Sequence, residues 1–369
     1  MKNEWIYEKL DDVCSVDYGT RVVQKKDKGS KYYVYGGGGA TFMVDTYNRE
    51  DCFVVARFAM SPKCTRFVSG KFFLNDSGLS VSTKSTKLLQ SFVNKVLLAN
   101  NDTIYNMGKG MAQKNLDMPS FRNLDIPVPP LQEQERIVAE LDLLTGIIDK
   151  QKQQLKELDT LAQSIFYDMF GNPVENDKGW EKKQIGKICT SKKQIQRASK
   201  RFKDSDIIRY IDISSIDNIN NVMTSTTSYG FGDAPSRAQQ VVEIGDVLIS
   251  LVRPNLNNVA MVSEDGTDLV ASSGFCVLRA NCEIVKEFLF YSVKMKCFTD
   301  YLMQRVSGAN YPAVREDDIM GYNIILPPLE LQESFAQKIQ SIESQKQSIN
   351  RSIAESQKLF DYTMDKYFG

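Results

Sequence analysis

Residues 129–171 read PPLQEQERIVAELDLLTGIIDKQKQQLKELDTLAQSIFYDMFG, and residues 327–369 read PPLELQESFAQKIQSIESQKQSINRSIAESQKLFDYTMDKYFG. Every position in the first stretch has its counterpart 198 positions later without a gap. Both stretches share the Pro-Pro-Leu start, a Gln-Glu pair and the Phe-Gly end, and such an internal repeat decides the architecture of a chain. Proline is tolerated in the first turn of a helix but not in its interior, and neither stretch holds a later proline. Each stretch is therefore predicted to form one long helix.

Both predicted helices carry an apolar seam with residues at spacings of three and four, which Gln151 interrupts in the first and Lys346 and Ser356 interrupt in the second. This pattern is typical of a coiled coil, where polar seam residues cost stability but can set register. At about 1.5 Å per residue each helix is roughly 60 Å long, so we expect an antiparallel pair of rods rather than two unrelated surface helices. The residues assigned to these helical spacers are Pro129, Pro130, Leu131, Gln134, Leu141, Leu144, Ile148, Leu155, Leu158, Pro327, Pro328, Leu329, Gln332, Ile339, Ile342, Ile349 and Ile353.

The repeat extends beyond the helices. WIYEKLDDVC at residues 5–14 is matched by WEKKQIGKIC at residues 180–189, and residues 110–126 match residues 308–324. Each half of the chain is thus an opening segment, a variable globule and a long helix. We predict an α+β fold in which two repeated α/β globules are joined by two long helices that pair as an antiparallel coiled coil. The predicted domains are 1–127, 128–172, 173–325 and 326–369, of which the second and fourth are the helical spacers.

The globules combine strand and helix signals. β-branched and aromatic runs bounded by turn residues predict strands, and a run of four glycines at residues 36–39 is either a site of close approach or a hairpin loop. The predicted strands cover residues 31–35, 51–57, 72–76, 207–213, 243–250, 259–262 and 274–279, and the predicted helices cover residues 88–98 and 286–302.

Composition excludes several classes of function. The chain has no histidine, which excludes Ser-His-Asp and Cys-His catalysis and histidine metal sites. Its seven cysteines are odd in number and form no CxxC motif, so we expect reduced thiols, no disulfide framework and no metal site. No apolar run approaches the roughly 18 residues of a membrane span, and the first residues lack a signal-peptide core. We therefore expect a cytoplasmic protein with no membrane association.

The net charge is zero but unevenly distributed. Residues 1–125 carry 18 Lys or Arg against 13 Asp or Glu, whereas residues 126–175 carry 4 against 9. The second globule opens with a basic cluster between residues 192 and 203, and residues 253–258 form a loop of one arginine and three asparagines. Arginine and asparagine can pair with guanine and adenine edges, so the globules are candidate nucleic-acid surfaces.

These features together resemble the specificity subunit of type I restriction-modification enzymes. The residues that carry the resemblance are IPVPPLQEQ (126–134), IILPPLELQ (324–332), GDVLIS (245–250) and SGANYP (307–312), and the likeness covers essentially the whole chain. It implies a non-catalytic DNA reader, in which each globule is a target recognition domain for one half of a bipartite, asymmetric site in double-stranded DNA and the rods act as a ruler.

The resemblance also implies partners. Two methyltransferase subunits, which use S-adenosylmethionine, would dock on the scaffold, followed by two motor-nuclease restriction subunits, which use ATP and Mg²⁺; no cofactor is expected on this chain itself. The sequence is consistent with this role, since it contains no Walker A motif and no Asn-Pro-Pro-Tyr or Asn-Pro-Pro-Phe motif.

The DNA-binding candidates are basic residues suited to phosphates and loop residues suited to base edges. They are Lys25, Lys26, Lys31, Arg57, Lys63 and Arg66 in the first globule, and Lys192, Arg197, Arg201, Arg253, Asn255, Asn257 and Asn258 in the second. Two alternatives remain open: a coiled-coil scaffold that binds proteins but not DNA, and a stand-alone enzyme that works without histidine.

Overall fold

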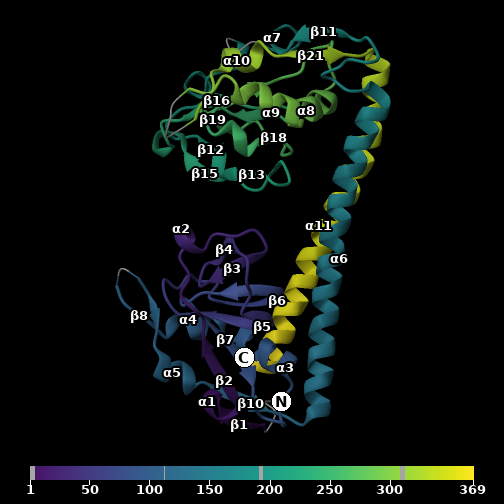
Figure 1. Cartoon of the computed structure of the whole chain (residues 1–369). Coiled ribbons are helices and arrows are strands. Elements are labelled where there is room, and N and C mark those ends of the chain that lie inside the picture. The colour runs from purple at the N-terminus through teal and green to yellow at the C-terminus, as the bar shows by residue number, and fades with distance from the viewer. Residues whose placement is uncertain (1–4, 112, 191–193, 308–311) are drawn as a thin grey trace. The chain divides into compact units, whose positions relative to one another are not determined.

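The computed structural model describes residues 5–111, 113–190, 194–307 and 312–369. The chain divides into two compact units, unit 1 (Met1–Gln153 and Asn350–Gly369) and unit 2 (Gln154–Ile349). Each unit contains one globule together with one end of both long helices (Figure 1). The domain boundaries expected from the sequence stay a prediction.

Unit 1 is built around a six-stranded sheet with the strand order β2-β7-β5-β6-β3-β4. Its strands are β1 (Ile6–Lys9), β2 (Cys14–Tyr18), β3 (Tyr32–Gly36), β4 (Gly39–Val44), β5 (Arg49–Ala56), β6 (Thr65–Leu74), β7 (Gly78–Thr83), β8 (Gly108–Lys109), β9 (Asn115–Leu116) and β10 (Asp125–Val128). Its short helices are α1 (Leu10–Val13), α2 (Gln24–Asp27), α3 (Gln90–Ala99), α4 (Asn101–Asn106) and α5 (Met118–Arg122).

The core of unit 1 joins the sheet to the long helices. Phe53 and Val55 of β5 and Phe92 of α3 are fully buried in one cluster with Leu141 and Tyr367, which come from the two long helices. Burying a large apolar side chain contributes about 1.5–3 kcal/mol of stability. The residues from the long helices therefore stabilise the packing of each helix end on the globule.

Unit 2 contains a four-stranded sheet (β15-β12-β19-β16) and a three-stranded sheet (β18-β17-β20). Its strands are β11 (Glu181–Gln184), β12 (Ile207–Ile211), β13 (Ile216–Asp217), β14 (Val222–Met223), β15 (Thr227–Gly230), β16 (Ala238–Val241), β17 (Val247–Ser250), β18 (Val259–Met261), β19 (Leu269–Ser272), β20 (Phe275–Leu278) and β21 (Asn323–Leu326). Its short helices are α7 (Ile185–Ile188), α8 (Lys286–Lys294), α9 (Lys296–Met303) and α10 (Glu316–Met320).

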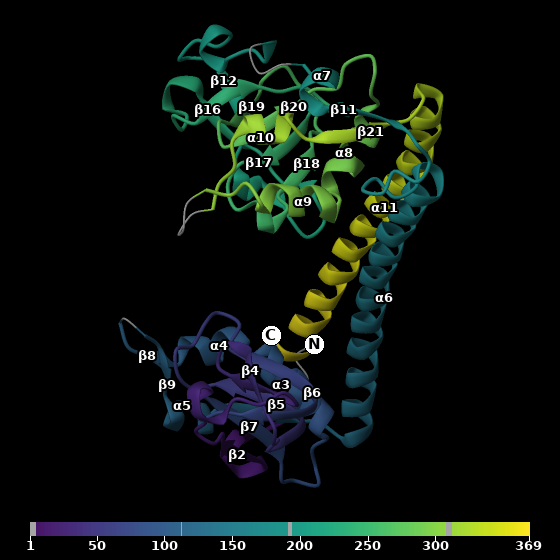
Figure 2. The ribbon, with the colours of Figure 1, turned by 45° about the horizontal axis from the view of Figure 1, so that its top comes forward.

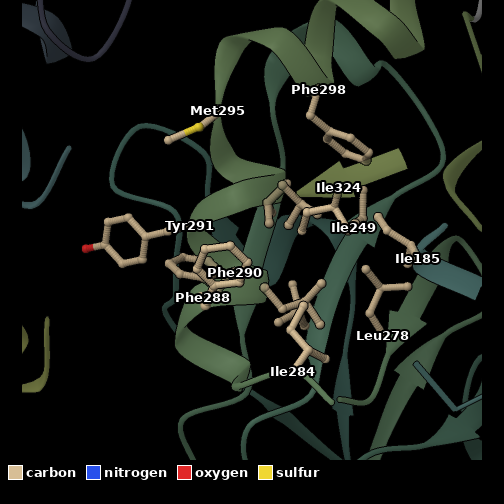
Figure 3. Close-up of a cluster of buried hydrophobic side chains, with 14 of the residues drawn as sticks. Ile185, Ile249, Leu278, Ile284, Phe288, Phe290, Tyr291, Met295, Phe298 and Ile324 are labelled. Atoms are coloured by element: carbon tan, nitrogen blue, oxygen red, sulfur yellow. The ribbon is translucent and has the colours of Figure 1, made fainter. Parts of the chain in front are cut away.

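Aromatic packing dominates the main core of unit 2. Phe288 of α8 belongs to one buried cluster with Ile249 of β17, Leu278 of β20 and Ile324 of β21 (Figure 3). Phe166 stacks on Phe288 with ring centroids 5.5 Å apart, so the long helix belongs to this core as well.

The repeat is visible in how each unit closes. β1 pairs antiparallel with β10, with Ile6 opposite Val128, and β11 pairs antiparallel with β21, with Glu181 opposite Leu326. In both units the strand that opens the repeat therefore pairs with the strand that directly precedes the Pro-Pro-Leu motif. The apolar residues that the two opening segments have in common follow these strands and are buried, with Leu10 and Val13 in unit 1 matching Ile185 and Ile188 in unit 2.

The two stretches of the repeat form α6 (Leu131–Phe170) and α11 (Leu329–Phe368), which lie side by side (Figure 2). In unit 1 the Tyr367 hydroxyl donates to Glu140 at 2.7 Å, and the Gln151 amide donates to Ser352 at 2.7 Å. From the first contact to the second, the residue number rises along α6 and falls along α11. The two helices therefore pair antiparallel. The predicted α+β class, with two repeated globules and two long paired helices, is confirmed.

The predicted seam residues differ in burial. Leu141, Leu144, Ile148, Ile339 and Ile342 are buried, as are Pro129, Gln134, Pro327 and Gln332, whereas Leu155, Leu158, Ile349 and Ile353 are half-buried and Pro130, Leu131, Pro328 and Leu329 are exposed.

Lys346, a polar seam residue, is buried in unit 2. Its ammonium group lies 3.0 Å from Asp159 of α6 and 3.1 Å from Glu343. Burial lowers the pKa of Lys346, but the two carboxylates outweigh it and the pKa is raised. The polar seam position is therefore occupied by a protonated lysine that forms ion pairs with two carboxylates.

Two local expectations are resolved by the structure. The predicted helix over residues 286–302 is wrong, because it is two helices, α8 and α9, separated by Met295 in an extended conformation. The Asn257 amide donates to the carbonyl of Lys294 at 3.1 Å and so occupies an acceptor at this break. The glycine run at residues 36–39 is the tight turn of the β3–β4 hairpin, where Gly39 has a φ of 111° that favours glycine.

Within the described ranges, no helix is both long and apolar enough to span a membrane.

Candidate nucleic-acid interface

Four of the lysine candidates in unit 1 lie on its surface. Lys25 and Lys26 belong to the short helix α2, Lys31 precedes β3, and Lys63 lies between β5 and β6; all four are exposed. Exposed lysines attract phosphates without discriminating between bases. The structure leaves their predicted role untested.

Arg57, which directly follows β5, lies between two aromatic rings. Its guanidinium group is 4.7 Å from the ring centroid of Tyr18 and 4.2 Å from that of Phe58. Both rings are partly exposed, and within the part of the chain that the structure describes no ion pair joins Arg57 to a carboxylate. Stacking on two rings limits the rotamers of the side chain, so Arg57 is a preorganised cation at the surface.

Arg66 has a role inside the fold. Its guanidinium donates hydrogen bonds to the carbonyl oxygens of Gly37 at 2.8 Å and Lys63 at 2.9 Å. These contacts fasten the glycine turn of the β3–β4 hairpin to β6. A contact between Arg66 and DNA stays a prediction, and it would have to use the remaining donors of the guanidinium.

The loop at residues 253–258 in unit 2 is more constrained than its sequence suggested. Arg253 and Asn257 both have left-handed backbones, with φ of 52° and 50°. Besides its bond to α8, Asn257 accepts a hydrogen bond from the Thr299 hydroxyl at 3.4 Å, so its amide group serves the fold. Asn255 is exposed and Asn258 half-buried.

The remaining unit 2 candidates precede β12. Arg197 and Arg201 are exposed, and the Arg201 guanidinium lies 5.6 Å from the ring centroid of Phe202. Lys192 lies outside the described residues, as do residues 308–311 of the repeated SGANYP segment.

A polar hollow lies beside Arg197 at the edge of the four-stranded sheet. It has a volume of ≈ 630 Å³ and is lined by residues that carry amide, hydroxyl or basic groups and by one isoleucine. None of the described residues that line it is acidic; they are Gln194, Ile195, Gln196, Arg197, Lys200, Gln239, Gln240 and Ser273. We refer to this set as the edge hollow.

Sequence reasoning found Arg197 but missed the glutamines beside it. The run Gln194-Ile195-Gln196 alternates polar and apolar residues, a signal for an extended segment with one face buried. That signal could have identified 194–196 as an exposed edge, but nothing in the sequence joins it to Gln239. Tyr18 was missed for the same reason, because it is distant in sequence from Arg57; Phe58 directly follows Arg57, so its proximity was visible in the sequence and was not used.

No group of three or more Cys, Asp or Glu residues in the described ranges is arranged to hold a metal ion. Burial raises the pKa of the Cys14 thiol to about 11 and that of the Cys189 thiol to about 12, so these two thiols are unreactive near neutral pH. The surfaces described above offer cations, amides and aromatic rings, which are groups suited to binding a ligand.

Comparison with known proteins gives a consistent result. The family model for the type I restriction modification DNA specificity domain matches residues 2–160 and residues 177–356. The type I restriction enzyme MjaVIII specificity subunit of Methanocaldococcus jannaschii is 26% identical over 304 residues, which cover 75% of this chain and 70% of that protein. The type I restriction enzyme HindI specificity subunit of Haemophilus influenzae is 24% identical over 159 residues, which cover 42% of this chain and 33% of that protein.

Two solved structures share the fold. The S subunit of a type I restriction-modification system from M. genitalium superimposes with a TM-score of 0.59 at 14% identity, covering 99% of this chain and 96% of that chain. A chain from a study of complex assembly and conformational transition in the type I R-M system superimposes with a TM-score of 0.51 at 19% identity, covering 99% and 97%.

Proposed function

The chain belongs to the family of type I restriction-modification DNA specificity proteins, and we propose on this basis that it recognises a bipartite, asymmetric site in double-stranded DNA. Each unit would read one part of the site. The paired helices alone would also suit the alternative, a coiled-coil scaffold without DNA binding, and the match to a DNA specificity domain favours DNA recognition over it.

The observation that carries the proposal is the agreement between the family match and the repeat. The family model matches twice, once in each half of the chain, and each half closes with an equivalent pair of strands in equivalent register. Two units that close in the same way but differ in their sheets and surface residues are suited to reading two different sequences. A site recognised in this way has two separate parts.

The proposed chemistry divides between phosphates and bases. The exposed lysines and arginines would hold the phosphate backbone, which makes affinity depend on salt. Arg57 in unit 1 and Arg197 in unit 2 are the basic candidates with the most defined surroundings, a pair of aromatic rings for the first and the edge hollow for the second. Arginine pairs with guanine through two hydrogen bonds in the major groove.

We further propose that the chain is a non-catalytic scaffold. Two methyltransferase subunits with S-adenosylmethionine and two restriction subunits with ATP and Mg²⁺ would supply the chemistry, and the chain itself would bind no cofactor. The absence of histidine and of a Walker A motif from the sequence supports this division. α6 and α11 each contribute to both units, which makes them candidates for setting the spacing between the two parts of the DNA site.

The test is a genome-wide map of N6-methyladenine in the host with and without the gene. We expect one bipartite motif to lose its methylation in the deletion strain and to regain it on complementation. A methylation map that does not depend on the gene contradicts DNA recognition and favours the scaffold alternative.

A further inference from the structure

The edge hollow is formed where an irregular segment runs along the sheet edge. β16 is the outer strand of its sheet, and the amide of Val241 donates to the carbonyl of Gln196 at 2.9 Å. Arg197 and Gln240 form an antiparallel bridge. The segment that carries Gln196 and Arg197 is therefore attached to the sheet by backbone hydrogen bonds.

Two buried side chains anchor this segment in the hydrophobic core. Ile195 packs in one hydrophobic cluster, with Val242 and Leu248, and Ala198 packs in another, with Ile208. Because residues 195 and 198 are anchored, Gln196 and Arg197 between them are both exposed on a backbone of defined position. Side chains on a fixed backbone lose less conformational entropy when they bind.

The side chains around the hollow differ in how many of their polar atoms already make hydrogen bonds within the fold. The Gln240 amide donates to the carbonyls of Ser272 at 2.9 Å and Phe275 at 3.0 Å, so it is part of the wall. The Gln239 amide nitrogen donates to the carbonyl of Ser236 at 2.9 Å, and no hydrogen bond to its amide oxygen is found within the described ranges. For Arg197, the described residues provide no carboxylate partner.

This combination matches the edges of purine bases. Arginine is the side chain that pairs with guanine through O6 and N7, and glutamine pairs with adenine through N6 and N7. The part of the lining that the structure describes contains no carboxylate that would repel the DNA backbone, and a hollow of ≈ 630 Å³ has room for base edges. The loop at residues 253–258 is a weaker reader, because the Asn257 amide is used within the fold.

We propose that the edge hollow is the base-reading site of unit 2, where Arg197 specifies a guanine and Gln196 and Gln239 specify neighbouring bases of the same half-site. This proposal rests on the DNA-recognition function proposed above and assigns that function to particular side chains. Lys200, at the rim, would contact phosphate and contribute affinity without base preference.

The experiment uses the full chain, expressed with its methyltransferase partner in a host that lacks the gene, and maps N6-methyladenine across the genome. The decisive variant is R197K, because it keeps the charge but loses the two-pronged geometry of the guanidinium. Q196A and Q239A test the amides, and Q345A, an exposed glutamine on α11 in the same unit, is the matched control. Binding of each purified variant to duplexes that differ at single positions of the motif provides a second readout.

We expect R197K to relax the requirement for guanine at one position in one half of the motif, with discrimination falling on the order of 10- to 100-fold. The other half of the motif and the Q345A map should not change. The proposal is overturned if R197K, Q196A and Q239A all preserve the wild-type motif, or if R197K alters both halves alike. It is also overturned if folded R197K loses binding equally for all duplexes. If the wild-type map itself does not depend on the gene, the proposed function fails and the assignment of the site falls with it, whereas a gene-dependent map that the variants leave unchanged overturns the assignment alone.

Discussion

Gln134 and Gln332 make equivalent hydrogen bonds from equivalent positions of the repeat. The amide oxygen of Gln134 accepts from the backbone N–H of Leu89 at 2.8 Å, and its nitrogen donates to the carbonyls of Lys87 at 2.7 Å and Pro129 at 2.8 Å. In unit 2, Gln332 accepts from the N–H of Val285 at 2.9 Å, and donates to the carbonyl of Pro327 at 2.8 Å and to that of Glu283 at 3.4 Å. Both glutamines are fully buried.

These contacts give the glutamine of the Gln-Glu pair the same structural role in both repeats. Leu89 and Val285 are the N-caps of α3 and α8, and neither has a side-chain cap. Each glutamine therefore satisfies a backbone donor at the start of a short helix and ties it to the carbonyl that precedes the long helix. The globule and the long helix are joined in the same way twice.

Replacing Gln134 by Leu should destabilise unit 1. The substitution keeps the side-chain volume but leaves the Leu89 N–H and two carbonyls without partners, which costs about 1–3 kcal/mol of unfolding free energy. Denaturant unfolding measures the loss, and hydrogen exchange should locate it at the start of α3. Q132L changes an exposed neighbour on the same helix and should have almost no effect. Equal loss of protection in units 1 and 2 would contradict the local role.

The architecture was predictable from the sequence because its signals are long and periodic. Forty residues in one register carry many seam positions, so the helices and their pairing could be predicted despite Lys346. The pairing of β1 with β10 follows the same repeat. No comparable pattern marks the break at Met295, where the Asn257 amide from a distant loop donates to the carbonyl of Lys294.

The candidate site was less predictable because it depends on contacts between distant segments. Residue type alone made Arg66 and Asn257 look available, whereas both make hydrogen bonds within the fold. Gln196 and Gln239 become neighbours only when the segment before β12 lies along β16. The types of the polar residues therefore indicate a class of ligand. Which of these side chains are free to contact the ligand depends on the hydrogen bonds they make within the fold.

Lys346 provides a second stability prediction. K346M removes the cation between Asp159 and Glu343, and we expect a loss of about 1–3 kcal/mol, below the cost for a fully buried pair because both carboxylates are about one-third exposed. A double-mutant cycle with D159N should give a coupling energy above about 0.5 kcal/mol. K338M, at an exposed site on the same helix, is the control, and a K346M variant as stable as K338M would refute the prediction.

The same lysine predicts a pH dependence. The pKa of Lys346 is raised above its ordinary value of 10.5 in the folded state, so the stabilisation is fully present below about pH 10.5 and is lost as the pH rises through the folded-state pKa. The neighbouring Lys294 has a pKa lowered by burial and releases its proton earlier. From neutral pH upwards, the stability difference between wild type and K346M should therefore persist until the solution is strongly alkaline, as measured by unfolding at a series of pH values.

The reactivity of the thiols tests which cysteines are buried and which are exposed in the folded protein. Cys282 is exposed, whereas Cys14 and Cys189 are buried with raised pKa values of about 11 and about 12. The thiolate is the reactive form, so at about pH 7.5 the folded protein should show one fast-reacting thiol, and all seven should react after unfolding. Mass spectrometry should locate the first modification at Cys282, and C282S should remove the fast phase. Early modification of Cys14 in folded protein would contradict the buried core of unit 1.

The long helices provide the last prediction, which concerns the spacing of the DNA site. Inserting four residues after Gln153 in α6 and four after Ile349 in α11 adds one helical turn, about 6 Å, to both rods. The two insertions face each other because Gln151 contacts Ser352. If the rods set the distance between half-sites, the spacer in the methylated motif should grow by one or two base pairs, at about 3.4 Å each, while both half-sites keep their sequences. Replacing exposed Lys152 and Lys156 by alanine without insertion should preserve the spacer. If the methylated motif keeps its original spacer after both insertions, the length of the helices does not set the distance between the half-sites.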